Sequence, residues 1–273
     1  MSSTIKRHGP VITPNSIPKN IDSSNINGPC VFERPNFLPG RSRYIMLFAH
    51  HRGDSIRVAY SNEPHYGWRV SQNTILKVDT LPELKDHVAS PDVIVGTNDI
   101  SVLIHGVTKG RQETRCYITK DLRKFEHHYE FPQVQFYARY ISRSIGSPCL
   151  LYKNENIGGM LCDFFGKSKK HVLPNMRHAC YDSKTDTVYY TRIGDCPEHI
   201  RSIKFNNIDS PEKSSIFMKP EGFEVALRCE PSRPGARIGN TEIRDPFILN
   251  TDNKKFIYYS YRGEEGIACA EII

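Results

Sequence analysis

A four-part unit recurs along this chain, and it limits the possible folds more than any other feature of the sequence. Each copy opens with a short strand-like segment at a polar or proline-containing motif. A turn, an aromatic-rich segment and a segment of small residues follow. The clearest copy comprises residues 244–248, 256–261 and 267–272. Other copies open at residues 33–37, 90–94 and 175–178, and residues 135–165 supply a less regular one. Five copies of about 50 residues match four-stranded blades, so the repeat predicts an all-β fold, a five-bladed β-propeller.

A β-sandwich with coincidentally similar hairpins is the alternative fold. Short apolar, aromatic and β-branched runs between turn residues are typical of both folds, and helical signal is limited to residues 81–88. The copies share a polar residue at the start of an otherwise apolar strand, and such a residue costs stability unless it is used or paired. A propeller brings all five strand openings to one end of its channel, so this architecture accounts for every copy.

The size of the chain suits a single domain of this kind. Its 273 residues, 38% of them hydrophobic, suffice for one large core. We expect residues 1–29 to form an N-terminal arm and residues 30–273 to form the propeller. The arm either pairs with the last blade and closes the ring, or has no fixed structure.

The net charge and the distribution of cysteines restrict the binding partners and the cellular compartment that we expect. The net charge of +7 favours an anionic partner, although ordinary surface charge is an equally good interpretation. No stretch has the apolar core of a signal peptide or the length of a membrane span, so a soluble, cytoplasmic protein without membrane contact is expected. The eight cysteines are scattered without a CxxC pair, which indicates reduced, mostly buried thiols.

The sequence lacks the motifs of several other classes of enzyme and of metal-binding protein. The chain has no GxGxxG, GxxxxGK[ST] or GxSxG motif and no HExxH or Cys/His zinc spacing, so we expect no cofactor and no metal site. The KSKKH run at 167–171 is too short to indicate nucleic-acid binding, and no nucleic-acid partner is expected. Oligomeric state has no signature in the sequence.

Three stretches carry a resemblance to a known family. They are HVASPDVIV at 87–95, PNMRHACYD at 174–182, and the C-terminal run from EIRDPFI at 242–248 to GEEGIACAE at 263–271. With these motifs the chain resembles a family of five-bladed propeller proteins that is related to glycoside hydrolase families 43, 32 and 62. The resemblance extends from about residue 31 to the C-terminus and is weakest over residues 126–170.

The resemblance implies three catalytic carboxylates. Glycoside cleavage needs an acid for the leaving oxygen and a second carboxylate as base or nucleophile. By resemblance, Asp92 would be the base or nucleophile, Glu230 the general acid and Asp245 the supporting carboxylate. The RDP motif lies here in the last blade rather than an early one, and Glu33-Arg34-Pro35 stands where related proteins have a first-blade aspartate. For each carboxylate alone, capping a strand opening is the competing structural role.

A second set of residues in the blade motifs is expected to bind substrate. Arginine suits a carboxylate, sulfate or phosphate, although a structural ion pair is the competing role. Alternation along a strand separates Arg244 from Asp245, and we expect His178 and Asp245 to face the same way as Asp92. A channel Ca²⁺ or water beside His178 is an open alternative. The expected binding residues are His105, Arg139, Arg177, His178, Arg244 and, as a stacking platform, Trp68.

Two main functions remain open at this point, and a third, a basic propeller that binds nucleic acid or protein partners, rests on charge alone. The leading hypothesis is a glycosidase-like hydrolase that acts on a small or anionic sugar with its funnel carboxylates. The alternative is a carbohydrate-binding or scaffolding propeller without catalysis. The distance between the carboxyl groups of Asp92 and Glu230 discriminates between them, and burial of either against a backbone amide favours binding.

Overall fold

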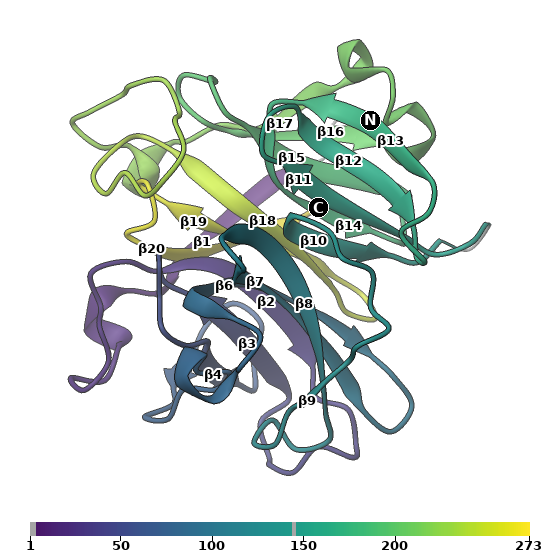
Figure 1. Ribbon diagram of the computed structural model, residues 1–273. Coiled ribbons are helices and arrows are strands. Elements are labelled where there is room, and N and C mark those ends of the chain that lie inside the picture. The colour runs from purple at the N-terminus through teal and green to yellow at the C-terminus, as the bar shows by residue number, and fades with distance from the viewer. Residues whose placement is uncertain (1–3, 144–145) are drawn as a thin grey trace.

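The computed structural model describes residues 4–143 and 146–273, and it shows five four-stranded antiparallel sheets arranged as the blades of a propeller (Figure 1). The predicted all-β, five-bladed fold is confirmed, and the sandwich alternative is not. The first three sheets are β2 (Asn27–Glu33), β3 (Tyr44–Ala49), β4 (Arg57–Ser61), β5 (Arg69–Val70); β6 (Lys85–Val95), β7 (Ile100–Thr108), β8 (Arg111–Thr119), β9 (Glu126–His127); and β10 (Phe136–Ile141), β11 (Cys149–Asn154), β12 (Gly158–Asp163), β13 (Lys169–Pro174).

The remaining two blades are built from the last third of the chain and its N-terminal strand. The helical elements within the described residues are single 3₁₀ turns, and none of the helices there is long and apolar enough to cross a membrane. The elements are β14 (Met176–Asp182), β15 (Thr187–Arg192), β16 (Ile200–Lys204), β17 (Ser215–Met218); β18 (Ile243–Asn250), β19 (Lys255–Tyr261), β20 (Gly266–Ile272), β1 (Ile5–Ile12); and η1 (Pro14–Ser16), η2 (Val78–Thr80), η3 (Phe205–Asn207), η4 (Pro211–Lys213), η5 (Gly222–Glu224).

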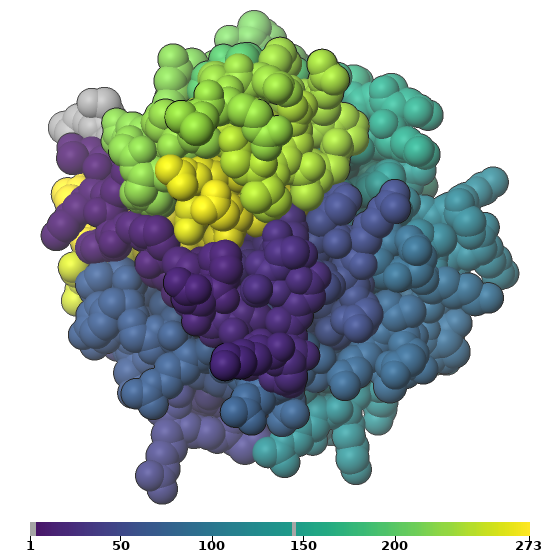
Figure 2. All heavy atoms as spheres, turned by 90° about the vertical axis from the view of Figure 1, so that its left-hand side faces the viewer, coloured from purple at the N-terminus to yellow at the C-terminus, as the bar shows by residue number. Residues whose placement is uncertain are grey.

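The two ends of the chain meet in one blade. Strand β1 pairs antiparallel with β20, from Ile5 opposite Ile272 to Ile12 opposite Ile267. In the space-filling view of Figure 2, the purple N-terminal part of the chain borders the yellow C-terminal part. The N-terminal strand therefore completes the sheet of β18, β19 and β20 and covers the edge that β20 otherwise exposes.

A β-bulge interrupts each of the five inner strands. The register with the second strand shifts just after Asn27, Ala89, Phe136, Met176 and Arg244. At each shift, two residues of the inner strand lie opposite a single residue of the second strand. The residue pairs in the bulges are Gly28-Pro29, Ser90-Pro91, Tyr137-Ala138, Arg177-His178 and Asp245-Pro246. Proline is tolerated at three of them because a bulge residue need not donate to the ladder. Each blade thus has a bulge in its inner strand, and the five bulges occupy equivalent positions in the blades.

The first blade corrects one boundary predicted from the repeat. Its inner strand is β2, Asn27–Glu33, whereas the sequence pattern placed the opening at residues 33–37. In the structure, residues 34–43 form the connection to β3. Pro35, Pro39 and Gly40 suit a turn rather than a central strand, while the side chains of β2 between its ends are buried.

The closing strand is expected to contribute measurably to stability. Ile12 is fully buried among the side chains of the first and last blades, so Ile12→Ala removes packed methyl groups. We expect a loss of about 2–5 kcal/mol in the free energy of unfolding, measured by urea denaturation. Lys6→Ala, on an exposed position of the same strand, is the control and should change it by less than about 0.5 kcal/mol. Equal effects of the two substitutions would contradict a stabilising role for β1.

Candidate binding funnel

All five inner strands line one cavity of about 420 Å³, four of them with bulge residues and the first with Asn27 just before its bulge. Such a volume accommodates a small ligand. Loops at the same end of the propeller add His51, Arg52, Pro234 and Gly235 to its wall. The residues that the inner strands contribute are Asn27, His87, Ala89, Ser90, Phe136, Tyr137, Arg177, His178 and Asp245.

Asp245 and His178 are paired in the buried part of this funnel, where burial lowers the pKa of the His178 imidazole. Oδ1 of Asp245 lies against Nδ1 of His178, although the two residues come from neighbouring blades. The other carboxylate oxygen accepts hydrogen bonds from Ser260 Oγ at 2.7 Å and the Gly28 amide at 3.3 Å. Burial opposes ionisation of Asp245, but His178 and Arg244 outweigh it and hold its pKa below the ordinary value. Asp245 is therefore an ionised anchor and is poorly suited to donate a proton.

A row of ring side chains continues from His178 across the funnel. Tyr137 packs against His178, with ring centroids 4.1 Å apart, and against the edge of His105 at 4.5 Å. Nε2 of His105 lies 3.4 Å from Nε2 of His87, whose Nδ1 contacts Asp86 at 2.9 Å. Burial lowers the pKa of His105 well below its usual value, and the neighbouring His87 lowers it further. Imidazole and phenol rings thus form one wall of the funnel.

Glu264 is a funnel carboxylate that sequence reasoning missed. Its Oε2 accepts hydrogen bonds from the side-chain amides of Asn25 and Asn27, both at 2.8 Å, and its Oε1 accepts one from Arg244 at 2.9 Å. It lies in the GEEG turn between β19 and β20, which the sequence analysis treated as a plain turn. Two adjacent acids in a four-residue turn were the available signal.

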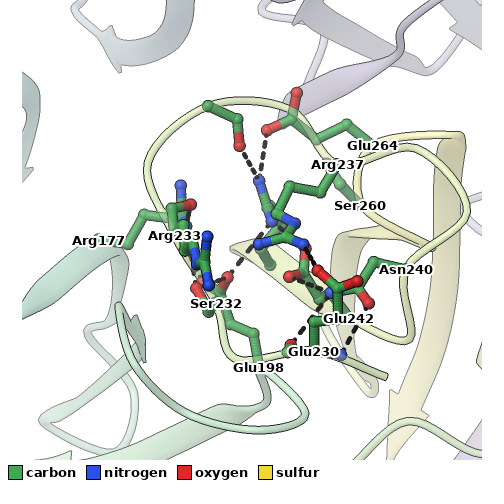
Figure 3. A network of polar contacts seen from close by, with 12 residues as sticks. Arg177, Glu198, Glu230, Ser232, Arg233, Arg237, Asn240, Glu242, Ser260 and Glu264 are labelled. Atoms are coloured by element: carbon green, nitrogen blue, oxygen red, sulfur yellow. Dashed lines mark hydrogen bonds and ion pairs between the residues drawn. The ribbon is translucent and has the colours of Figure 1, made fainter. Parts of the chain in front are cut away.

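A network of buried charges supports the funnel from behind (Figure 3). Arg244 is 0% exposed and contacts Glu242, Glu264 and Glu198. Arg177 donates to Glu198 at 2.9 Å and to Ser232 Oγ at 2.9 Å, and its guanidinium also contacts the Arg233 carbonyl. Arg177 still lines the cavity, whereas Arg244, expected to bind substrate, is fully engaged within the protein.

The structure does not bring the three expected catalytic carboxylates together. Asp245 lines the cavity, but Asp92 and Glu230 do not. Asp92 lies beyond the bulge of β6, where its carboxylate accepts the Tyr140 amide of β10 at 3.0 Å. Burial raises the pKa of Asp92, while Arg139 opposes that shift. Glu230 lies in the long connection between β17 and β18, exposed and paired with Arg237.

Arg139 and Trp68, two expected binding residues, have structural contacts instead. Arg139 donates to the carbonyl groups of Pro91 at 2.8 Å and Ala179 at 3.0 Å, so it connects the inner strands of three consecutive blades. Trp68 is buried, donates to the Pro64 carbonyl at 3.1 Å and packs edge-on against Tyr258. Of the six expected binding residues, His105, Arg177 and His178 line the cavity.

The described side chains can also be assessed for their ability to bind a metal ion and to form hydrogen bonds with a ligand. Within residues 4–143 and 146–273, no group of three or more His, Cys, Asp or Glu side chains is arranged to hold a metal ion. Two buried acceptors of cavity-lining residues, Asn27 Oδ1 and Gln112 Oε1, have no hydrogen-bond partner among the described residues. Buried polar atoms are rarely left without a partner, so these oxygens point to a hydrogen-bonding ligand or water.

Comparison with known proteins places the fold. No protein-family model matches the chain. An uncharacterized protein of Acanthamoeba polyphaga mimivirus is 23% identical over an alignment that covers 91% of this chain and 83% of that protein. A glycosyl hydrolase from Bacteroides ovatus superposes with a TM-score of 0.69 at 11% identity, over 99% of this chain and 94% of the other.

Two further structures agree with this result. A structure from glycoside hydrolase family 130, described as mannoside phosphorylases that include hydrolases acting on β-1,2 mannosidic linkages in Candida mannan, has a TM-score of 0.67. It is 11% identical, over 99% of this chain and 94% of the other. A xylose-bound family 43 enzyme from Xanthomonas citri has a TM-score of 0.63 at 9% identity, over 92% and 88%. The fold is that of the five-bladed propeller glycoside hydrolases. The predicted resemblance is confirmed at the level of fold.

Asp92 is expected to stabilise the folded protein. Asp92→Ala leaves the buried Tyr140 amide without an acceptor, and we expect a loss of about 1–3 kcal/mol in the free energy of unfolding. Asp92→Asn keeps an acceptor oxygen and should lose less. Chemical denaturation of both variants tests this, and an alanine variant as stable as the wild type would contradict it.

The buried imidazole of His105 predicts a pH dependence of stability. Its pKa is lowered in the folded state, so the unfolded chain binds more protons below its ordinary pKa of about 6.5. Stability should therefore be complete above about pH 6.5 and fall below it, by up to about 1.4 kcal/mol per pH unit. His105→Gln should reduce the loss between pH 7 and pH 5 in urea denaturation, whereas His128→Gln, outside the funnel, should not. Identical pH profiles for wild type and His105→Gln would refute this assignment.

Proposed function

We propose that this chain is a carbohydrate-binding propeller whose funnel takes a small saccharide with an anionic substituent. The funnel combines aromatic faces with hydrogen-bond donors and acceptors, which suits the apolar faces and hydroxyl groups of a sugar. The fold shared with glycoside hydrolases, among them a family with members that act on mannosidic linkages and an enzyme that binds xylose, supports a carbohydrate as the ligand.

Positive charge in the funnel supports an anionic substituent. Lys153, Arg52 and Arg177 line the cavity, and among the described residues neither Lys153 nor Arg52 has an ion-pair partner. The Lys153 ammonium lies 4.5 Å from the centre of the Phe136 ring, and burial lowers its pKa. The carboxylates of Asp245 and Glu264 are already paired with His178 and Arg244. A carboxylate, sulfate or phosphate on the sugar would offset the remaining cations.

One observation carries the preference for binding over hydrolysis. Both deep carboxylates of the funnel are held by several donors, and neither is arranged as a proton donor. Cleavage of a glycosidic bond by a pair of carboxyl groups needs one of them to be protonated beside the scissile bond. The equivalent bulge positions in the first two blades hold Gly28 and Ser90 rather than acids. Asp92, buried against the Tyr140 amide, fits the binding hypothesis as well.

A second candidate function is glycosidic cleavage, and Glu155 favours it. This residue follows β11, is exposed, and lines the same cavity as Asp245. It is the funnel carboxylate whose side chain has no hydrogen bond or ion pair within the described residues. In this alternative, Glu155 would protonate the leaving oxygen and Asp245 would be the second carboxylate.

One experiment separates the two functions. A panel of neutral, uronic, sulfated and phosphorylated sugars is titrated by calorimetry, and the matching aryl glycosides are assayed for release of the aryl group. We expect binding of an anionic member without turnover, and an affinity about 10-fold lower for Lys153→Met. Glu230→Gln, outside the cavity, is the control and should bind like the wild type.

Two results would overturn the proposal. Turnover by the wild type that is abolished in Glu155→Gln would establish cleavage in place of binding alone. The absence of binding across the whole panel, with Lys153→Met indistinguishable from wild type, would remove the carbohydrate assignment.

A further inference from the structure

Two cysteines differ from the other six in their exposure. Cys196 and Cys229 are exposed, whereas the remaining cysteines are buried or partly buried. Burial raises the pKa of buried thiols such as Cys116 to about 12, which makes them poor nucleophiles. Cys196 and Cys229 are therefore the thiols that are most accessible to an oxidant.

The two exposed thiols are also neighbours. Cys196 Sγ lies 3.8 Å from the carbonyl oxygen of Cys229, although 33 positions separate them in the sequence. Partial burial raises the pKa of the Cys229 thiol, and the adjacent Cys196 thiol raises it further. Two accessible thiols in contact are candidates for a disulfide bond.

Backbone hydrogen bonds already hold the two segments side by side. The Gly194 amide donates to the Ser232 carbonyl at 3.0 Å, and the Ser232 amide donates to the Asp195 carbonyl at 2.9 Å. Cys196 directly follows this paired stretch on one segment, and Cys229 precedes it by three residues on the other. The cysteines thus lie at the end of an existing contact between two loops.

One of these loops forms part of the funnel wall. Residues 219–242 connect β17 to β18, and Pro234 and Gly235 within this connection line the cavity. Ser232 Oγ and the Arg233 carbonyl hold Arg177, as Figure 3 shows, and the Gly235 carbonyl accepts a hydrogen bond from Arg244 at 3.0 Å. Any restraint on this loop therefore acts on the funnel.

We propose that Cys196 and Cys229 form a site of reversible oxidation, and that the resulting disulfide fastens the loop of residues 229–235 in its place as a wall of the funnel. A low-molecular-weight disulfide such as oxidised glutathione is the oxidant. One cysteine thiolate attacks it and releases one glutathione thiol, and the second cysteine then displaces the other. Two protein thiols lose two protons and two electrons, and the oxidant becomes two thiols.

The test uses the full chain in glutathione buffers of defined ratio. Intact mass should fall by about 2 Da in the oxidised form, and a non-reducing peptide map should contain one Cys196–Cys229 linked pair. The loop closed by this bond is long, so we expect the melting temperature to rise by about 5 °C and proteolysis within residues 219–242 to slow. Reduction with dithiothreitol should reverse all of these changes.

Single variants and a matched control complete the test. Cys196→Ser and Cys229→Ser should each gain a glutathione adduct rather than the internal bond, and Cys149→Ser, a partly buried cysteine on β11, should behave as wild type. The peptide map of the wild type decides the assignment even if a variant folds poorly. An oxidised chain without the Cys196–Cys229 link would overturn the site, and a link that leaves melting and proteolysis unchanged would overturn the restraint.

The effect on ligand affinity rests on the proposed function and is measured separately. Oxidised and reduced chains are compared in the sugar titration, where a restrained wall should increase affinity at least twofold. Formation of the bond with no sugar binding at all would leave the oxidation site intact and count only against the carbohydrate ligand. Binding that is equal in both forms would remove the coupling of the loop to the funnel.

Discussion

The bulge at the opening of each inner strand is the constraint on which the funnel depends. A regular strand points its side chains alternately to its two faces. Inner strands without a bulge would therefore all place side chains along the channel with the same regular spacing. The break in register takes two successive residues out of the ladder, and in four of the five blades one or both of them line the cavity. Gly28, Ser90, Tyr137 and Asp245 hold left-handed backbone angles there, which non-glycine residues rarely adopt. Strain of this kind persists where the surrounding structure enforces it, and Ser90, Tyr137 and Asp245 carry it in the wall of the funnel.

The bulges are stabilised by cations that are themselves out of reach of solvent. Arg139 binds the carbonyl groups of the second and fourth inner strands, and Arg244 joins three carboxylates behind the last. Burying charges is costly unless each has partners, so these arginines fix the relative positions of the blades more than they add net stability. Arginines in conspicuous motifs can therefore position the blades around a cavity without lining it.

The sequence allowed the ring, but only part of its lining, to be predicted. The repeat of strand openings was sufficient for the fold because five similar hairpins have few ways to bury their apolar faces together. Asp245 and His178 were recognisable from motifs that coincide with bulges. Asp92 sits only two residues beyond Ser90, and no sequence pattern reveals that the bulge falls before it. Glu264 and Glu230 lie in connections, whose paths depend on contacts with distant segments such as Asn25 for the one and Arg237 for the other.

The pairing of β1 with β20 has a consequence for the way this chain is made. Strand β1 is synthesised before the other four blades, whereas its partner β20 is synthesised after them. Closing a loop of that length carries a large entropic cost and slows folding relative to the local hairpins of each blade. The nascent chain must therefore carry β1 without its partner while the other blades form, and the ring can close only once β20 has been made.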